Sequence, residues 1–286
     1  MATLATLALG LAAAVYFAAG LLYQGHFLVR WRPYARWAPL VTATGAVVHT
    51  LALVLYSLAA GRLPLTSVWE SLSFFAWLTV VVYLLLEWRL RMHLVGAFAV
   101  PLVFLAVLCA TLTLPTGLPV PPNRNAWFLV VHAIPAFLSY VAFLLAFCVA
   151  LLYLLQAWLL KAKRLGRLQQ VLPSLEQLDS LGYRLIALGF PLLTLGIVSG
   201  AIYFGETTGG NHWGWLTQEM GPLITWLVYA VYLHARLVAG WQRARITWLL
   251  IAGFVIVVLT YVVAHPSLPG MHSFSTQATT LPSPGE

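Results

Sequence analysis

The chain has 286 residues, of which 62% are hydrophobic and only 8% are charged, against roughly 45–50% and about 25% in soluble domains. This composition excludes a soluble globular domain and also an intrinsically disordered chain. The formal net charge of +8 does not indicate a nucleic-acid partner, because the basic residues form short clusters between apolar runs and no continuous basic face.

Apolar stretches long enough to cross the ~30 Å hydrocarbon core of a bilayer recur along the chain. Eight are present, at residues 4–27, 40–60, 67–87, 94–114, 127–158, 182–204, 221–238 and 246–264. They predict an all-α fold, a polytopic integral membrane protein with eight transmembrane helices in a single transmembrane domain over residues 1–286. The fifth stretch is longer than a bilayer requires, so its helix is expected to project from the membrane or to tilt.

The Lys and Arg residues divide unevenly between the two sides of the predicted membrane. All but two of the 15 lie in or beside the first, third, fifth and seventh connections, and the exceptions are Arg62 and Arg124. Basic residues gather on the cytoplasmic side of membrane proteins. The pattern therefore predicts a multi-pass protein of the cell inner (plasma) membrane with both termini on the outer side, where residues 273–286 form an external tail.

Two connections carry further predictions. Leucines recur at helical spacing over residues 165–182, opposite polar residues, which indicates an amphipathic helix on the inner membrane surface. Residues 205–220 are predicted to form an external loop that contains tryptophan. The two cysteines, Cys109 and Cys148, lie far apart within apolar runs and form no C-x-x-C motif, so they are expected to be small buried side chains.

Eight histidines accompany only seven acidic residues, and an ionisable side chain within a membrane suggests a function. For His26, His93 and His265 an interfacial side chain without a role is the simplest interpretation. The role of His49, in the middle of the second stretch, stays open. The sequence contains no H-E-x-x-H, nucleophile-elbow, phosphate-loop or dinucleotide motif.

His132 and His272 form the strongest candidate site. Both are expected at the outer face, on either side of the external loop that contains Trp213 and Trp215. Two neutral imidazoles on opposite sides of a planar apolar group hold a b-type haem, and aromatic rings offer flat surface to the macrocycle. The pattern predicts non-covalently bound haem b with His132 and His272 as axial ligands of the iron. Tryptophans also occur at membrane interfaces without any ligand, which is the alternative interpretation.

Two carboxylates are further candidates, Glu70 and Glu219, at the outer ends of the third and seventh stretches. The helix dipole favours a carboxylate near a helix N-terminus, so a solvated helix-terminal side chain is the simpler interpretation for both.

Several segments resemble the CcsA/ResC family of haem-handling cytochrome c biogenesis proteins, in the short eight-span form of HemX type. They are Trp69–Leu72 (WESL), Leu178–Arg184 (LDSLGYR), Leu188–Thr194 (LGFPLLT), Leu223–Tyr229 (LITWLVY), Tyr232–Arg236 (YLHAR) and Met271–Ser273 (MHS). The CcsA-like body covers about residues 62–273. The resemblance implies a CcsB/ResB-like membrane subunit and apocytochrome c as partners, within a lipid bilayer.

By this resemblance, His132 and His272 match two external haem-ligating histidines, and His234 matches an in-membrane histidine on the route of haem. The family's tryptophan-rich motif is kept at Gly210, Trp213, Trp215 and Glu219. It departs at Gly209, His212, Leu216, Thr217 and Gly221, where the family has Trp, an aromatic residue, Asp, Pro and Trp. His212 is expected to replace part of the lost aromatic surface.

The resemblance implies that the chain presents haem at the outer membrane face for covalent attachment to apocytochrome c, as a component similar to a cytochrome c haem lyase. The altered tryptophan motif leaves a second interpretation open. In that interpretation the chain is a non-catalytic structural or regulatory subunit of another membrane complex and holds no haem.

Overall fold

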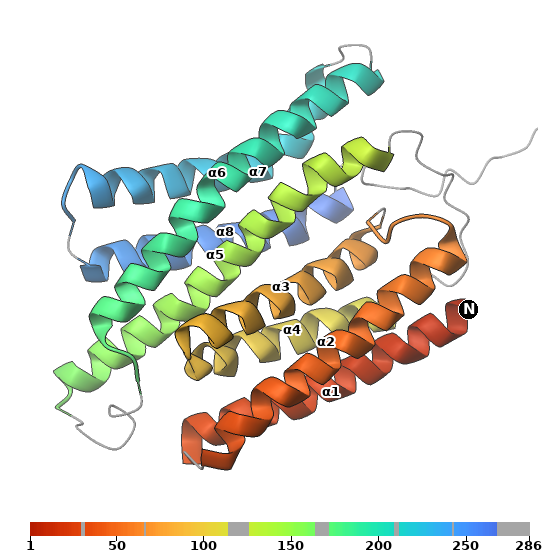
Figure 1. Cartoon of the computed structure of the whole chain (residues 1–286). Coiled ribbons are helices and arrows are strands. Elements are labelled where there is room, and N and C mark those ends of the chain that lie inside the picture. The colour runs from red at the N-terminus through yellow and green to blue at the C-terminus, as the bar shows by residue number, and fades with distance from the viewer. Residues whose placement is uncertain are drawn as a thin grey trace, which may run out of the picture.

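The computed structural model describes residues 1–29, 32–65, 67–113, 126–163, 172–208, 212–241 and 243–267. The helices follow the apolar stretches one by one (Figure 1): α1 (Ala2–Val29), α2 (Arg32–Ala60), α3 (Val68–Leu90), α4 (His93–Thr113), α5 (Ala126–Lys161), α6 (Leu175–Thr208), α7 (His212–Leu237) and α8 (Arg243–Ser267). These ranges contain no strand, so the predicted all-α fold is confirmed.

Length and composition make six of the described helices able to cross a membrane, α1 to α6. In α8 the described residues include a shorter apolar helix, Arg245–Leu259. The chain is therefore a multi-pass membrane protein. As expected, α5 is longer than a bilayer requires, with 36 residues.

Helices extend into two of the predicted connections. Residues 175–182 belong to α6, because Ser174 and Gln177 form a capping box in which each backbone N–H donates to the other side chain, at 3.0 and 3.2 Å. The predicted loop at 205–220 is wrong for most of its length, since α6 continues to Thr208 and α7 begins at His212. No proline interrupts this start of α7 before Pro222, and most of its side chains are compatible with a helix.

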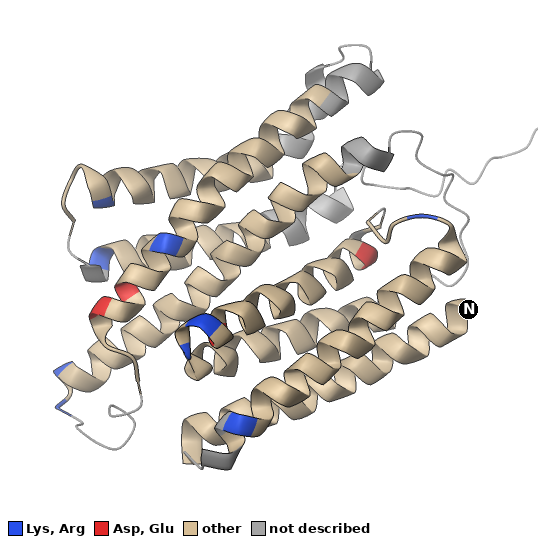
Figure 2. Ribbon diagram, viewed as in Figure 1, with Lys and Arg blue, Asp and Glu red and all other residues tan. Residues whose placement is uncertain are grey.

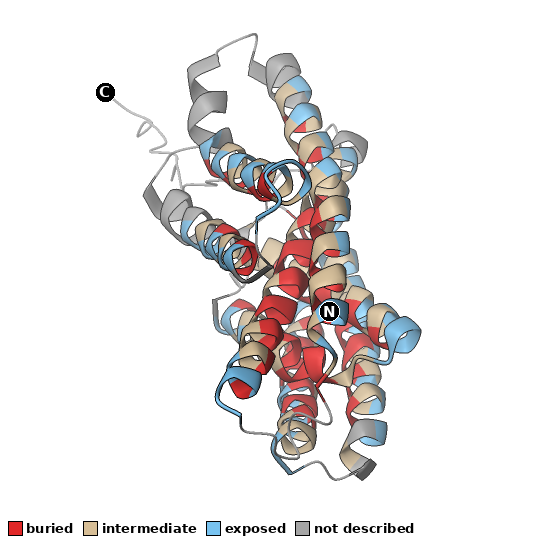
Figure 3. Cartoon of the chain, turned by 90° about the vertical axis from the view of Figure 1, so that its left-hand side faces the viewer, coloured by how far each residue is buried: buried red, intermediate tan, exposed pale blue. Residues whose placement is uncertain are grey.

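The helices form two groups of four that meet at α5. Helices α1–α4 pack on one another, α5–α8 do the same, and α5 also contacts α3 and α4 (Figure 1). The main core runs through both groups, from Tyr23 and Tyr83 in the first to Phe143, Leu193 and Tyr229 in the second. Buried residues lie along the middle of the molecule and exposed ones on its outward faces (Figure 3). Those outward faces carry many apolar side chains, as a lipid environment requires.

A row of glycines lets α5 and α6 approach closely. Gly182, Gly189 and Gly196 occupy every seventh position on α6 and so share one face. A Cβ at Gly189 would lie 2.6 Å from Phe143 Cε1, and one at Gly196 would lie 3.2 Å from Ala136 Cβ. Small residues at a helix–helix contact allow two backbones to come together in a membrane. The last two glycines therefore set the distance between α5 and α6.

The described Lys and Arg residues gather at one end of the bundle (Figure 2). This basic end is where α1, α3, α5 and α7 end and α2, α4, α6 and α8 begin. Among the described basic residues, Arg62 is the exception, because it lies between the end of α2 and the start of α3, at the opposite end. Exposed tryptophans lie near the basic end as well, namely Trp37, Trp88, Trp158, Trp241 and Trp248. Basic residues and tryptophans together are typical of a membrane–water boundary.

Candidate haem site

His132, the first predicted ligand, lies near the start of α5, at the end of the bundle opposite the basic end. Its Nδ1–H donates a 2.8 Å hydrogen bond to the carbonyl oxygen of Gly196 on α6. A carbonyl oxygen only accepts, so Nδ1 carries a proton, and in the neutral ring Nε2 then keeps its lone pair. A metal-bound histidine has the same arrangement, in which the second nitrogen is held by a hydrogen bond. His132 therefore presents a nitrogen suited to a haem iron.

The close approach of α5 to α6 makes this hydrogen bond possible. Ala136, one turn after His132, already lies against Gly196, with its backbone N only 3.4 Å from the position of a Cβ at residue 196. A side chain at that position would push the two helices apart and move the carbonyl away from His132. The sequence indicated His132 as a site residue but not Gly196. Only the seven-residue spacing of the glycines could have indicated that Gly196 lies at a close helix contact.

The other residues of the predicted site are described only in part. His212, Trp213, Trp215 and Glu219 belong to the first turns of α7, but their side chains fall outside the described residues. His272 and the external tail lie outside the described ranges altogether. Because α7 starts where α6 ends, the structure brings the backbone of these α7 residues to the same end of the bundle as His132 (Figure 1).

His234 lies away from His132. It occupies the last turn of α7, at the basic end, and it is exposed. The structure therefore separates these two candidate haem residues by the length of the second helix group.

Arg236 and Asp179 form an ion pair close to His234 that the sequence did not predict. The two terminal nitrogens of Arg236 each donate to one carboxylate oxygen of Asp179, both at 2.8 Å. The guanidinium carbon also lies 4.6 Å from the centre of the Tyr183 ring. This bidentate pair joins α6 to α7. Both charged residues occur in segments that resemble the CcsA/ResC family, but only their proximity in space shows that they pair.

Glu70 is buried, whereas its sequence position suggested a solvated side chain. Only 3% of it is exposed. Arg62 donates to both carboxylate oxygens, at 2.8 and 2.9 Å, and the Tyr56 hydroxyl donates to one of them at 2.5 Å. Glu70 also completes a capping box with Ser67 at the start of α3. The hydrogen bonds to Glu70 raise the pKa of Arg62, so the arginine of this pair stays charged.

Two histidines outside the haem site have defined partners. His93 Nδ1 lies 2.6 Å from one carboxylate oxygen of Glu87, and the Tyr23 hydroxyl donates to the other at 2.7 Å. His93 thus helps to join α3 and α4 to α1, a role that the sequence did not suggest. His49 is fully buried in the middle of α2, and both of its ring nitrogens have hydroxyl partners.

Comparisons with known proteins agree with this architecture. The family described as "Cytochrome C assembly protein" matches residues 65–272. The "Cytochrome c biogenesis protein CcsA" of Guillardia theta is 33% identical over 255 residues, which cover 82% of this chain and 83% of the relative. The protein of the same name from Prochlorococcus marinus (strain MIT 9303) is 35% identical over 265 residues, with 82% and 83% covered.

A solved structure shares the fold. "Cytochrome c Heme Lyase CcmF" aligns with a TM-score of 0.65 at 16% identity over 92% of this chain. The chain spans about half the length of that protein, 48%. At this identity the likeness concerns the fold alone. The family match, by contrast, covers most of the sequence, from the turn before α3 to His272. The chain therefore belongs to the cytochrome c assembly protein family.

Proposed function

We propose that this chain handles haem in cytochrome c maturation: it binds haem b at the end opposite the basic end and presents it for covalent attachment to apocytochrome c. The observation that carries the proposal is the hydrogen bond from His132 Nδ1 to Gly196, which leaves Nε2 available to iron. The names of the relatives, which refer to cytochrome c biogenesis, support the pathway.

In this proposal His132 and His272 would hold the haem iron, and Trp213, Trp215 and His212 would supply packing surface. Bound haem supplies the vinyl groups that form thioether bonds with apocytochrome thiols. The chain itself binds and orients. The Gly196 carbonyl holds the His132 ring so that Nε2 keeps one direction, and His234 offers an imidazole at the basic end, on the inward part of the route.

His132→Ala is expected to abolish the low-spin haem spectrum of the purified full-length protein, and added imidazole is expected to restore much of it. The truncated side chain leaves an open coordination position that free imidazole fills. The measurements are the absorption spectrum and the ratio of haem to protein. His93→Gln is the matched control, because His93 lies at the basic end and glutamine keeps a donor toward Glu87.

The double variant His132→Ala/His272→Ala separates the two candidate functions. Loss of haem supports the proposal. A haem content equal to that of the wild type would remove the proposed site. A wild-type protein that lacks haem altogether would favour the other candidate function, a non-catalytic subunit. The altered tryptophan motif, which has Gly209 and Leu216 in place of Trp and Asp, suggests that function.

We further propose that the chain crosses the cell inner membrane eight times, with the basic end in the cytoplasm, both termini outside and a CcsB/ResB-like subunit beside it. The gathering of basic residues at one end supports this orientation. The described helices alternate in direction, which puts the N-terminus at the end opposite the basic one (Figure 1).

Cysteine labelling of intact cells tests the orientation. Leu63→Cys, opposite the basic end, is expected to react with a membrane-impermeant maleimide, and Lys163→Cys, at the basic end, is expected to be protected. Both positions are exposed. Cys148 is buried, as expected from the sequence, and stays in place, but the expectation is wrong for Cys109, which is exposed. The background is therefore Cys109→Ala. Labelling at 163 with protection at 63 would reverse the proposed orientation.

A further inference from the structure

His49 is an ionisable residue in the middle of a membrane helix that the haem site does not use. It is 0% exposed. Its Nε2 lies 3.0 Å from Ser73 Oγ on α3, and its Nδ1 lies 3.4 Å from the Tyr16 hydroxyl on α1. A hydroxyl both donates and accepts, so these two partners suit a neutral and a protonated imidazole alike. Buried ionisable groups in membrane proteins often lie on paths of ions or protons.

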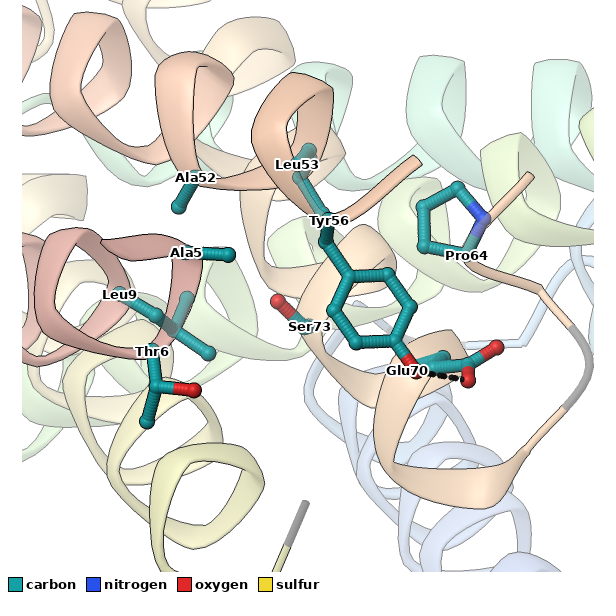
Figure 4. A pocket seen from close by; sticks show the side chains of 9 residues that line it. All are labelled: Ala5, Thr6, Leu9, Ala52, Leu53, Tyr56, Pro64, Glu70 and Ser73. Carbon is teal, nitrogen blue, oxygen red and sulfur yellow. Dashed lines mark hydrogen bonds between the residues drawn. The ribbon is translucent and has the colours of Figure 1, made fainter. Parts of the chain in front are cut away.

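A small cavity lies between the start of α1, the end of α2 and the start of α3, near the end opposite the basic end. Its volume is about 20 Å³, and its walls include Ala5 of α1, Ala52 of α2 and the polar side chains of Tyr56, Glu70 and Ser73 (Figure 4). A cavity above roughly 10–15 Å³ on this measure holds a water molecule when polar partners are present. The hydroxyls and the carboxylate provide such partners, so the cavity is suited to water.

Ser73 connects the cavity to the histidine. Its side chain lines the cavity, and its Oγ is the hydrogen-bond partner of His49 Nε2. We propose that His49 is a proton-binding site that is reached from the end opposite the basic end, through the cavity water and the Ser73 hydroxyl. The hydroxyl passes its proton to Nε2 and takes one from the cavity water, which in turn takes one from a hydronium ion of the solvent. Neutral imidazole thus becomes imidazolium, and both Ser73 and the cavity water are restored.

The surrounding charges allow the proton to leave again. Helix α2 packs against α1 and α3. On these two helices, the titratable side chains that contact His49 or line the cavity are Tyr16 and Glu70. On the side of α2 and its following loop, Tyr56 and Arg62 both bind Glu70. The negative charge of Glu70 is thus balanced by Arg62, and the hydrogen bonds of His49 go to hydroxyls. No carboxylate among the described residues holds the imidazolium, so protonation is reversible.

Exchange of the imidazole C2 proton for deuterium tests the proposal, because this reaction needs a protonated ring in contact with water. The full-length protein in lipid nanodiscs is incubated in deuterated buffer, and His49 is followed by peptide mass spectrometry. Ala52→Val fills the cavity and is expected to slow exchange at His49 by about tenfold or more, since the added methyl groups exclude water. Ala14→Val is the matched control, because Ala14 is exposed on the outward face of α1, and it is expected to leave the rate unchanged.

His93, which is 35% exposed at its side chain, serves as an internal reference and is expected to exchange equally in every variant. If Ala52→Val fails to fold, as its melting temperature would show, Ala5→Val fills the same cavity from α1. Absence of exchange at His49 in the wild type would overturn the proposal. Equal exchange in the wild type and in a folded cavity-filled variant would overturn it too, because water would then reach the ring by another route.

Discussion

Glu70→Gln is expected to destabilise the protein by about 3 kcal/mol, because breaking one side of a buried ion pair leaves the other charge without compensation. The Arg62 side chain is 10% exposed and that of Glu70 3% exposed, so water cannot replace the lost carboxylate charge. Glutamine keeps the capping-box role at the third position of α3, so the substitution isolates the charge. The measurement is the thermal midpoint of unfolding of the purified protein in detergent.

Two further variants complete this experiment. Glu176→Gln is the control, because Glu176 is an exposed acidic residue in the first turn of α6, and its loss is expected to cost less than about 0.5 kcal/mol. Arg62→Leu/Glu70→Gln removes both charges and is expected to be more stable than Glu70→Gln alone. A Glu70→Gln midpoint equal to that of the wild type would mean that the ion pair contributes nothing to the fold.

Gly189→Ala is expected to cost about 2 kcal/mol, as overpacking of a close-packed core does. The new Cβ would lie 2.6 Å from Phe143 Cε1. Phe143 is stacked on Tyr229, with 4.0 Å between ring centroids, and Tyr229 itself lies only 2.8 Å from the position of a Cβ at Gly253 on α8. Because this row of contacts runs through four helices, the phenylalanine ring has little room to move. Helices α5 and α6 are expected to separate.

Gly182→Ala is the matched control on the same face of α6. A Cβ there would meet Leu250 at 3.4 Å and Val149 at 3.9 Å, which are ordinary contacts. The higher helix propensity of alanine is expected to leave stability unchanged or to raise it by up to about 1 kcal/mol. Unfolding midpoints and haem content are measured together, since separation of α5 from α6 also weakens the bond between His132 and Gly196. Equal midpoints for the two variants would show that Gly189 does not set the helix spacing.

The helices and the division of charge could be predicted from the sequence. An apolar stretch in a bilayer must satisfy its backbone hydrogen bonds internally, so each one long enough to cross becomes a helix, whatever its neighbours are. The basic clusters follow alternate stretches and therefore meet at one end once the helices alternate in direction. Helix ends were harder to predict, as α6 and α7 show. Polar residues can belong to a helix when a cap such as Ser174 starts it, as in α6, or when no proline interrupts it, as in the first turns of α7.

The tertiary structure alone decided which side chains meet. In α3 and α4 apolar residues cover all sides, so their sequences carry no stripe that marks the packed face. Arg62 reaches Glu70 through a turn, Asp179 meets Arg236 across α6 and α7, and His132 finds the carbonyl of Gly196 on a neighbouring helix. Each contact depends on the rotation and separation of two helices. The rotation and separation of two helices depend on how closely small residues let their backbones approach. This distance is a property of the packed pair, so the sequence of either helix alone does not determine it.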